Sequence, residues 1–319
     1  MMMFNVSVGV VGVGGVGAHH AMILKGICEF VGVYDIREDI RKTVSQRLGI
    51  REFQSLEELL KHVDAVFICT PPFTHASLIE VIAEEGKHIF CEKPLSVNVN
   101  DAEQVVKTVD KSGIIFMMGF VLRFHPLYAR IKELLDQGTI GSVVNAWFFD
   151  VRGPFRKGVG SWRLRREFSS GIFEQIVHEV DLIRWIIGEP SRVFALSNKL
   201  VLQDTDYEDN IVYLLKMRNS SIVTLISSIC SKSRVRDLGI VGSQGTLIAK
   251  EGKIFLNDQL VEYEKWNAVK REDIYFLSCV QKGLKPTVNE IDGYRAQVIG
   301  EAALKSIALE KEVAIEYKY

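Results

Sequence analysis

Lys93 is the first side chain in this sequence whose setting suggests chemistry. It belongs to Glu92-Lys93-Pro94, which directly follows a predicted strand, His88–Cys91. A lysine at the end of a buried strand could hydrogen-bond a substrate hydroxyl and hold down the pKa of a neighbouring imidazole by like-charge repulsion. A lysine after a strand is otherwise only solvated, so the place of this strand in the fold decides between the two interpretations.

His178 is the second such side chain, and acidic residues flank it. Glu174 lies four residues before it and Asp181 three residues after it, so all three can share one face of a helix. A histidine between carboxylates can act as a general acid or base, because an acid orients the ring and stabilises imidazolium. Two alternatives stay open: an ordinary polar helix face, and a metal site that lacks a second histidine or a cysteine nearby.

A basic, glycine-rich loop precedes that helix. Its basic residues are Arg152, Arg156, Lys157, Arg163, Arg165 and Arg166, with no acidic residue among them. Arginine suits the recognition of carboxylate or phosphate, so the loop could bind an anionic group of a substrate, with Arg163 as the candidate. A solvated loop or a subunit contact would have the same composition.

A glycine motif lies near the start of the chain, in Gly12-Val13-Gly14-Gly15-Val16-Gly17. It follows the apolar run Val6–Val11 and opens a predicted helix, which is the context that a dinucleotide-binding G-x-G-x-x-G requires. Its glycines would let the backbone approach a pyrophosphate, and the helix N-terminus would face that charge. A purely structural turn is the alternative.

Asp35 ends the next predicted strand, Phe30–Tyr34, 18 residues after Gly17 (35 − 17). An acid there accepts hydrogen bonds from the adenosine ribose and repels a 2′-phosphate, which favours NAD over NADP. Arg37 could soften that preference, so NADP stays possible. Ile36, between the two, is predicted to line the same cofactor, whereas a helix-capping role is the alternative for Asp35.

The turn Thr70-Pro71-Pro72-Phe73-Thr74-His75 follows the predicted strand Asp64–Cys69. Ligands of doubly wound sheets lie at the carboxyl ends of the strands, so this turn should line the cofactor. The two prolines would fix the backbone without offering donors. The predicted cofactor contacts here are Thr70, Pro71, Pro72 and His75, and after the next strand Glu92 and Lys93. A rigid connection with no other role is the alternative.

The elements that would hold these residues divide the chain near residue 120. Before it, strands alternate with helices, which implies a parallel sheet with right-handed crossovers. The predicted helices are Ala18–Lys25, one ending at Leu48, a short one opened by a capping box at Ser55–Glu58, His75–Glu85 and Asp101–Ser112, and the last strand is Ile114–Met118.

After residue 120 the pattern changes. Helices are predicted over Pro126–Gln137 and Phe173–Ile187, and then, from about Arg192 to Trp266, strands joined by short turns predict an antiparallel sheet. A last helix is predicted over Gly293–Leu309. We therefore predict an α/β chain with two domains: residues 1–120 form a doubly wound parallel sheet of Rossmann type that binds NAD(P), and residues 121–319 form an α+β domain with a large, mostly antiparallel sheet that binds the substrate.

Composition argues against several classes of protein. The chain is 47% hydrophobic and 25% charged, with 39 basic and 40 acidic side chains, which argues against a nucleic-acid partner. No apolar run approaches the roughly 18 residues needed to span a membrane. Met1–Val11 lacks a basic leader and a cleavage site, so we interpret it as a strand and not a signal peptide. Five scattered cysteines are typical of reduced thiols in a cytoplasmic protein.

Taken together, these segments resemble the GFO/IDH/MocA oxidoreductases, the superfamily of glucose–fructose oxidoreductase and inositol dehydrogenase. The resemblance keeps family order over nearly the whole chain, and Glu92-Lys93-Pro94 with its lead-in is its most specific part. The segments that carry it are Gly12–Gly17 with His20, Asp35, Thr70-Pro71-Pro72 with His75, Gly86–Leu95, Gly119-Phe120 with Arg123-Phe124, Gly171 with His178–Leu182, Trp185 and Gly188-Glu189-Pro190, and Asp292–Ala296.

The resemblance implies an NAD(P)-dependent oxidoreductase acting on a secondary alcohol of a sugar, cyclitol or polyol, as a homodimer or homotetramer packed through the open face of the C-terminal sheet. It implies that Lys93 and His178 are the catalytic lysine and histidine. His178 would take the hydroxyl proton as hydride passes to NAD, while Lys93 steadies the oxyanion.

The same resemblance bears on the other site residues. Glu174 stands where the family has an aspartate, and it is predicted to be catalytic and to bind substrate together with Arg123 and Arg163. The Lys93–Pro94 bond resembles a cis peptide of the family. No metal is expected.

Three other functions stay open on the sequence. One is a glycosidase of the same superfamily that uses NAD only transiently. Another is a non-catalytic regulator that senses dinucleotides, which would not need both Lys93 and His178. The third is a reductase of the biliverdin or dihydrodiol type.

Overall fold

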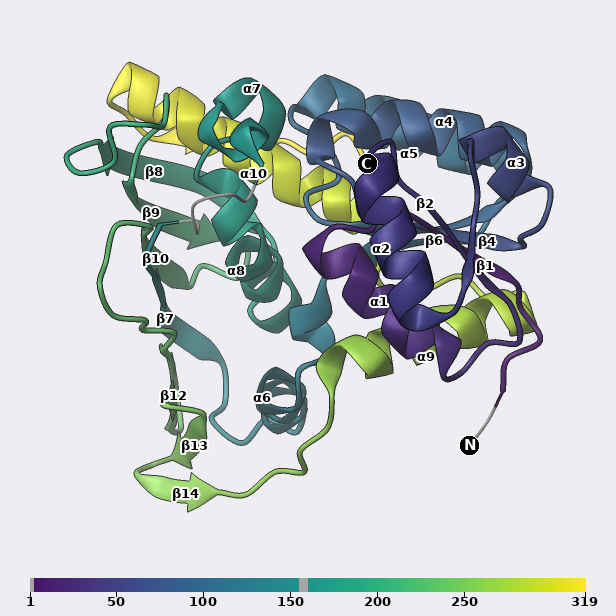
Figure 1. Ribbon diagram of the computed structural model, residues 1–319. Helices are drawn as coiled ribbons and strands as arrows, with labels where there is room; N and C mark the ends of the chain where they lie inside the picture. The colour runs from purple at the N-terminus through teal and green to yellow at the C-terminus, as the bar shows by residue number, and fades with distance from the viewer. Residues whose placement is uncertain (1–2, 155–159) are drawn as a thin grey trace. The chain divides into compact units, whose positions relative to one another are not determined.

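The computed structural model describes residues 3–154 and 160–319 and divides into two compact units (Figure 1). The first unit contains the chain up to Val121 together with Asn267–Tyr294, and the second contains Leu122–Trp266 and Arg295–Tyr319. The chain therefore returns to the first unit after the sheet of the second. The division of roles at residue 120, cofactor against substrate, stays a prediction.

The first unit is built on a six-stranded sheet in which all strands are parallel, with the order β3-β2-β1-β4-β5-β6. Its strands are β1 Val8–Val11, β2 Val31–Tyr34, β3 Arg51–Glu52, β4 Ala65–Ile68, β5 His88–Glu92 and β6 Phe116–Gly119. The strand order reverses between β1 and β4, and this is where ligands of doubly wound sheets bind. The predicted Rossmann topology is confirmed.

Helices cover both faces of this sheet. They are α1 Gly15–Lys25, α2 Glu38–Leu48, α3 Leu56–Leu60, α4 His75–Glu84, α5 Val99–Ser112 and α9 Ala268–Lys282. Figure 1 shows α1 and α9 on one side of the strands and α4 and α5 on the other. Because both faces are covered, β1 and β4 are buried at every position, which explains their continuous apolar sequences.

Capping side chains set several helix ends. Ser55 accepts a hydrogen bond from the Glu58 amide, as a capping box requires, but the Glu58 carboxylate reaches the Gln54 amide instead of that of Ser55. The fifth helix begins at Val99, earlier than predicted, because the Asn98 side chain caps it by accepting from the Asp101 amide.

The second unit is built on a nine-stranded sheet with the order β14-β13-β12-β11-β7-β10-β9-β8-β15. Its strands are β7 Val143–Val151, β8 Pro190–Asn198, β9 Asn210–Met217, β10 Ile222–Ser228, β11 Leu238–Gly242, β12 Thr246–Lys250, β13 Lys253–Leu256, β14 Gln259–Val261 and β15 Val313–Ala314. Only β7 and β10 pair in parallel among the described strands of this sheet. The predicted, mostly antiparallel sheet is confirmed.

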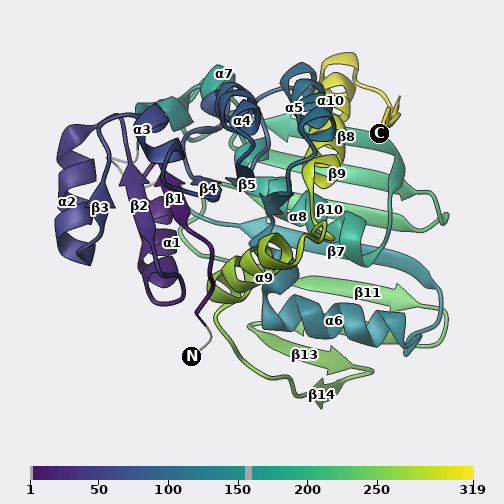
Figure 2. The ribbon, with the colours of Figure 1, turned by 90° about the vertical axis from the view of Figure 1, so that its right-hand side faces the viewer.

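Helices of the second unit lie against one face of this sheet. They are α6 Pro126–Asp136, α7 Arg166–Ser169, α8 Phe173–Ile186 and the later part of α10 Glu290–Leu309. Figure 2 shows α6 in front of the strands, where it packs on β13. The packing of α10 on α8 is close, since a Cβ at Gly300 would stand 2.6 Å from the Phe173 ring.

The opposite face of this sheet carries apolar side chains in rows across the strands. Phe149, Ile226, Val212 and Leu196 are neighbours in register, from β7 through β10 and β9 to β8. Leu196 is 58% exposed, although a leucine on a covered sheet would be buried. In the part of the chain that the structure describes, no helix has the length and apolar character needed to cross a membrane.

Candidate functional site

Three turns that carry predicted site residues follow three neighbouring strands. The glycine loop follows β1, the Thr70 turn follows β4 and the Lys93 turn follows β5. Val11, Ile68 and Cys91 are partners in register, so the three parallel strands end at the same level. The sheet therefore brings the predicted cofactor residues of the first unit to one edge.

The glycine loop has the geometry that a dinucleotide needs. Gly12 has a φ of +82°, and a Cβ at Gly17 would stand 1.9 Å from the Gly12 carbonyl oxygen, so neither position tolerates a side chain. A Cβ at Gly14 or Gly15 would meet no atom of the described residues within 4 Å. Gly12 and Gly17 thus lock the turn, while Gly14 and Gly15 leave the backbone at the start of α1 open to a phosphate.

Asp35 is fixed beside that loop. Its carboxylate accepts from the backbone amides of Val13 and Arg37, each at 2.9 Å, and the residue is 8% exposed. Arg41 stabilises the same segment by donating to the Asp35 carbonyl oxygen at 3.0 Å. Ile36, by contrast, is 85% exposed, as a side chain that could cover an adenine would be. These residues fit the adenosine half of NAD.

His75 ties two of the turns together. Its Nδ1 lies 2.9 Å from the Pro94 carbonyl oxygen and its Nε2 lies 2.9 Å from that of Thr70. Burial lowers the pKa of this ring, which is fully enclosed. The predicted contact of His75 with the cofactor can therefore act only through the turns that it joins, those of Thr70-Pro71-Pro72 and Lys93-Pro94.

The Lys93 turn is shaped by the residue before it. The Lys93–Pro94 bond is cis, as the resemblance implied. One oxygen of the Glu92 carboxylate accepts from the Lys93 amide at 3.2 Å, and the other lies 3.1 Å from His20. Burial alone would raise the pKa of Glu92, but the hydrogen bond and charge of His20, helped by Lys93, hold it below its usual range.

In the second unit, Glu174 and Arg163 come together. Nη2 of Arg163 lies 3.6 Å from Oε1 of Glu174, and the Arg163 guanidinium stacks 4.1 Å from the centre of the Trp162 ring. The side-chain amide of Gln175 donates to the other Glu174 oxygen. Nη1 of Arg152 in turn donates to Oε1 of Gln175 at 2.8 Å. Two residues predicted to bind substrate thus form one polar group at the start of α8.

Two other cations of the basic loop have carboxylate partners within the chain, and Arg165 donates to the Asp204 carbonyl oxygen at 3.5 Å. Arg152 pairs with Asp150 at 2.5 Å, and Arg166 pairs with Glu208. Arg156 and Lys157 lie outside the described residues. Arg163 also faces a carboxylate, that of Glu174, so its binding of an anionic substrate group stays a prediction.

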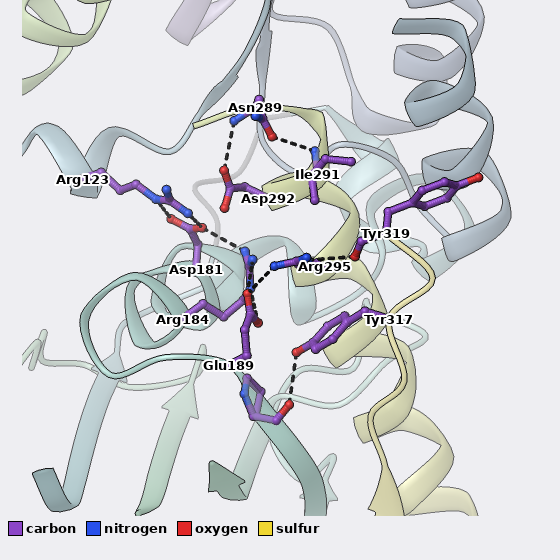
Figure 3. A network of polar contacts seen from close by, with 11 residues as sticks. Arg123, Asp181, Arg184, Glu189, Asn289, Ile291, Asp292, Arg295, Tyr317 and Tyr319 are labelled. Atoms are coloured by element: carbon purple, nitrogen blue, oxygen red, sulfur yellow. Dashed lines mark hydrogen bonds and ion pairs between the residues drawn. The ribbon is translucent and has the colours of Figure 1, made fainter. Parts of the chain in front are cut away.

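His178 is half-buried one helical turn after Glu174, and the acids around it are held by arginines. Both oxygens of Asp181 accept from Arg123, at 2.8 and 2.5 Å (Figure 3). Glu179 pairs with Arg236 at 2.5 Å, and burial raises its pKa to about 7. The ion pair gives Arg123 a clear structural role, and its contact with substrate stays a prediction.

Figure 3 follows this ion pair through the second unit. Arg184 contacts Asp181 and donates to Glu189 at 2.9 and 2.7 Å, and Arg295 reaches Glu189 at 3.1 Å. The network fixes the far end of α8 to the start of β8 and to α10, which stabilises the helix that carries His178.

Two models of known protein families match this chain. Residues 6–120 match the oxidoreductase family with an NAD-binding Rossmann fold, and residues 128–248 match the GFO/IDH/MocA C-terminal domain. The chain belongs to the GFO/IDH/MocA oxidoreductase family. The predicted family, oxidoreductase class and NAD-binding domain are thereby confirmed.

Relatives match this chain over nearly its whole length. A myo-inositol 2-dehydrogenase from Thermotoga maritima is 29% identical over 97% of this chain and 98% of its own, and an inositol 2-dehydrogenase from Rhizobium meliloti is 27% identical over 98% and 99%. The crystal structure of a probable dehydrogenase from Thermotoga maritima superposes with a TM-score of 0.85 at 29% identity, covering 97% of this chain and 99% of that one.

Several polar residues of the first unit have no role that the sequence predicts. His20 is only part of the family resemblance, and the acids Glu272 and Asp273 of α9 belong to no sequence motif. Asp273 lies 2.8 Å from His20, so these residues stand directly behind the Lys93 turn. A helix signal was available, because Asn267 caps α9 and Gly283 ends it in the left-handed conformation.

Proposed function

We propose that this protein transfers a hydride between NAD and a secondary alcohol, or the matching ketone, of a sugar, cyclitol or related polyol. The observation that carries the proposal is the shared edge of β1, β4 and β5, where the glycine loop, the Thr70 turn and Lys93 lie together. A cofactor loop beside a lysine suits chemistry on a hydroxyl group. The names of the two relatives, both inositol dehydrogenases, support the substrate class.

Different residues of the first unit would bind different parts of the cofactor. Gly14, Gly15 and the α1 N-terminus would bind the pyrophosphate, and Asp35 would bind the adenosine ribose. NAD, when bound, supplies the acceptor for the hydride. Asp35 also disfavours a 2′-phosphate by charge, which makes NAD the preferred cofactor over NADP.

Lys93 and His178 are assigned the chemistry on the substrate hydroxyl. The Lys93 ammonium donates a hydrogen bond to the hydroxyl oxygen and stabilises the negative charge that develops there. A ring nitrogen of His178 accepts the hydroxyl proton. Glu174, with Arg163 beside it, orients the substrate by accepting from a second hydroxyl.

The experiment that tests this function combines binding with turnover. NADH and NADPH are titrated by fluorescence, and inositols, sugars and sugar acids are then screened for NAD reduction, with inositols first. Tight NADH binding and turnover of a polyol are expected. Binding with no turnover across the panel would contradict the dehydrogenase function.

We also infer that the open face of the second sheet packs against another copy of the chain. The rows of partly exposed apolar side chains on β7, β10, β9 and β8 support this, because water contact with such a surface is unfavourable. The five cysteines are free thiols, in keeping with a cytoplasmic location.

A further inference from the structure

A chain of buried polar groups runs behind Lys93 in the first unit. Oδ1 of Asp273 lies 2.8 Å from Nδ1 of His20, and Nε2 of His20 lies 3.1 Å from Oε1 of Glu92. The second Glu92 oxygen then accepts from the Lys93 backbone amide at 3.2 Å. His20 is 1% exposed and Asp273 is fully buried. The chain of contacts thus connects the protein interior to the lysine turn.

Three separate segments of the polypeptide contribute to these buried polar contacts. His20 is on α1, the helix that begins in the glycine loop, Glu92 ends β5, and Asp273 is on α9, which packs against α1. The rings of Phe67 and Phe90 lie 5.5 and 5.2 Å from the His20 ring. These aromatic walls leave the ring little contact with water, so its hydrogen bonds are made in surroundings of low polarity, where they are strong.

The charge of the His20 ring follows from its hydrogen-bond partners. Both ring nitrogens of His20 face carboxylate oxygens, so both need a proton to donate. Burial would lower the pKa of His20, but Asp273 and then Glu92 outweigh it and raise the pKa well above its usual range. The titratable groups around the ring are Glu92 and Lys93 after β5, Asp273 and Glu272 on α9, His19 on α1 and Cys69 after β4.

We propose that His20 is a positioning residue for Lys93: held by Asp273, its ring fixes the Glu92 carboxylate, and Glu92 fixes the backbone amide of Lys93. This inference rests on the proposed role of Lys93. It also gives α1 a second task, because the helix that would receive the cofactor phosphates carries the ring that sets the lysine turn. The cofactor loop and the lysine are thereby held in one fixed arrangement.

The position of a reacting group has a large effect on rate. A misplacement of about 1 Å can cost about 100-fold in turnover. Loss of the contact between His20 and Glu92 would free the Glu92 carboxylate to turn away from the Lys93 amide. The expected loss is in kcat, since the glycine loop and Asp35 would still hold the cofactor.

Two substitutions of His20 separate positioning from packing. The side-chain nitrogen of glutamine lies where Nε2 stood and can still donate to Glu92, whereas that of asparagine lies where Nδ1 stood and can donate only to Asp273. We expect His20→Gln to lower kcat about 3- to 10-fold and His20→Asn about 100-fold, with the NADH Kd changed less than about threefold in both. His19→Asn, an exposed neighbour on α1, is the matched control and should leave kcat unchanged.

Equal losses of kcat in the two His20 variants would overturn the proposal, and so would no loss in either. Lys93→Met is made in parallel. If it leaves kcat unchanged, the proposed function itself fails. If it abolishes turnover while both His20 variants keep theirs, only the positioning role fails.

A further variant covers the case in which His20→Asn does not fold. Asp273→Asn keeps an acceptor for the ring but removes the charge that favours the protonated form. We expect its kcat to fall several-fold below that of the wild type at pH 8 and to recover toward it at pH 6, because the lower pH favours the protonated ring. The same ratio to the wild type at both pH values would overturn the proposal.

Discussion

Glu174 illustrates, at the scale of single residues, how a carboxylate is held in place for a ligand. Arg163 and Gln175 each engage one of its oxygens, and Arg152 holds Gln175. Each carboxylate oxygen has more than one acceptor position, so Glu174 could still accept from a substrate hydroxyl. The longer side chain, in place of the family's aspartate, is thus compatible with the proposed role because its neighbours fix it.

His178 gives the first prediction at this scale. His178→Ala removes the proposed proton acceptor but leaves the first unit untouched. We expect kcat to fall about 100- to 10,000-fold, the range for general acid–base groups, with the NADH Kd unchanged. Stopped-flow and steady-state NADH formation measure this. His62→Ala, an exposed histidine of the first unit, is the control. An unchanged rate of NADH formation in His178→Ala would remove the acid–base role.

Glu272 gives a prediction about stability. Its side chain is fully buried, and neither oxygen has a hydrogen-bond partner among the described residues. Burial, and then the charge of Glu92, raise its pKa well above the usual range. A carboxyl with a raised pKa in the folded state gives stability that is fully present below its unfolded pKa of about 4.3 and is lost as pH rises through the folded value.

Glu272→Gln keeps the shape and removes that titration. We therefore expect the Tm of the variant to exceed that of the wild type at pH 8 and the difference to disappear near pH 4. Thermal unfolding between these pH values measures it. Glu84→Gln, an exposed glutamate on α4, should show no such trend. A variant that is less stable than the wild type at pH 8 would contradict this account.

At the scale of elements, the turn between β1 and α1 allows a comparison of two glycines. Gly17→Ala places a Cβ 1.9 Å from the Gly12 carbonyl, so the turn must open. Gly15→Ala places its Cβ in open space at the first residue of α1. We expect both to weaken NADH binding, but only Gly17→Ala to lower the Tm, by several degrees. Equal Tm values would mean that the turn absorbs the methyl group without strain.

The sequence patterns that predicted elements correctly were local ones. Continuous apolar runs identified β1 and β4, and glycine and capping residues set the ends of most helices to within a few residues. The parallel pair of β7 and β10 was not predictable, because no local pattern shows which strands become neighbours. The same holds for His20 and Asp273, which are separated by 253 residues. Such pairs become visible only when the fold brings α1 and α9 together.

At the scale of the molecule, the second sheet has one face covered by helices and one on which the described residues place no helix. On the open face Phe194, Leu214, Thr224 and Trp147 form a second row in register, beside the row that ends at Leu196. The Trp147 ring lies over Gly239, where a Cβ would stand 2.0 Å from it, so the ring is held flat against the sheet. A flat apolar face of several strands is suited to burial against an identical face.

Leu214 is the position at which this proposal can be tested most directly. It lies on β9 between Phe194 and Thr224 and is 47% exposed. Leu214→Glu would place a charge within an apolar interface, where burying it without a partner costs several kcal/mol, about enough to separate the copies. Light scattering coupled to size-exclusion chromatography should give a dimer or tetramer for the wild type and a monomer for the variant.

NADH binding shows whether the Leu214→Glu chain is still folded, because the glycine loop and Asp35 lie in the other unit. Leu284→Glu is the matched control. Leu284 is an exposed leucine like Leu214, at 55%, but it lies in the first unit and not on the open sheet face. It should keep the mass of the wild type. A monomeric wild type, or a Leu214→Glu variant of unchanged mass, would exclude this face as the contact between copies. A monomer that still binds NADH would instead separate assembly from cofactor binding and assign assembly to the open sheet.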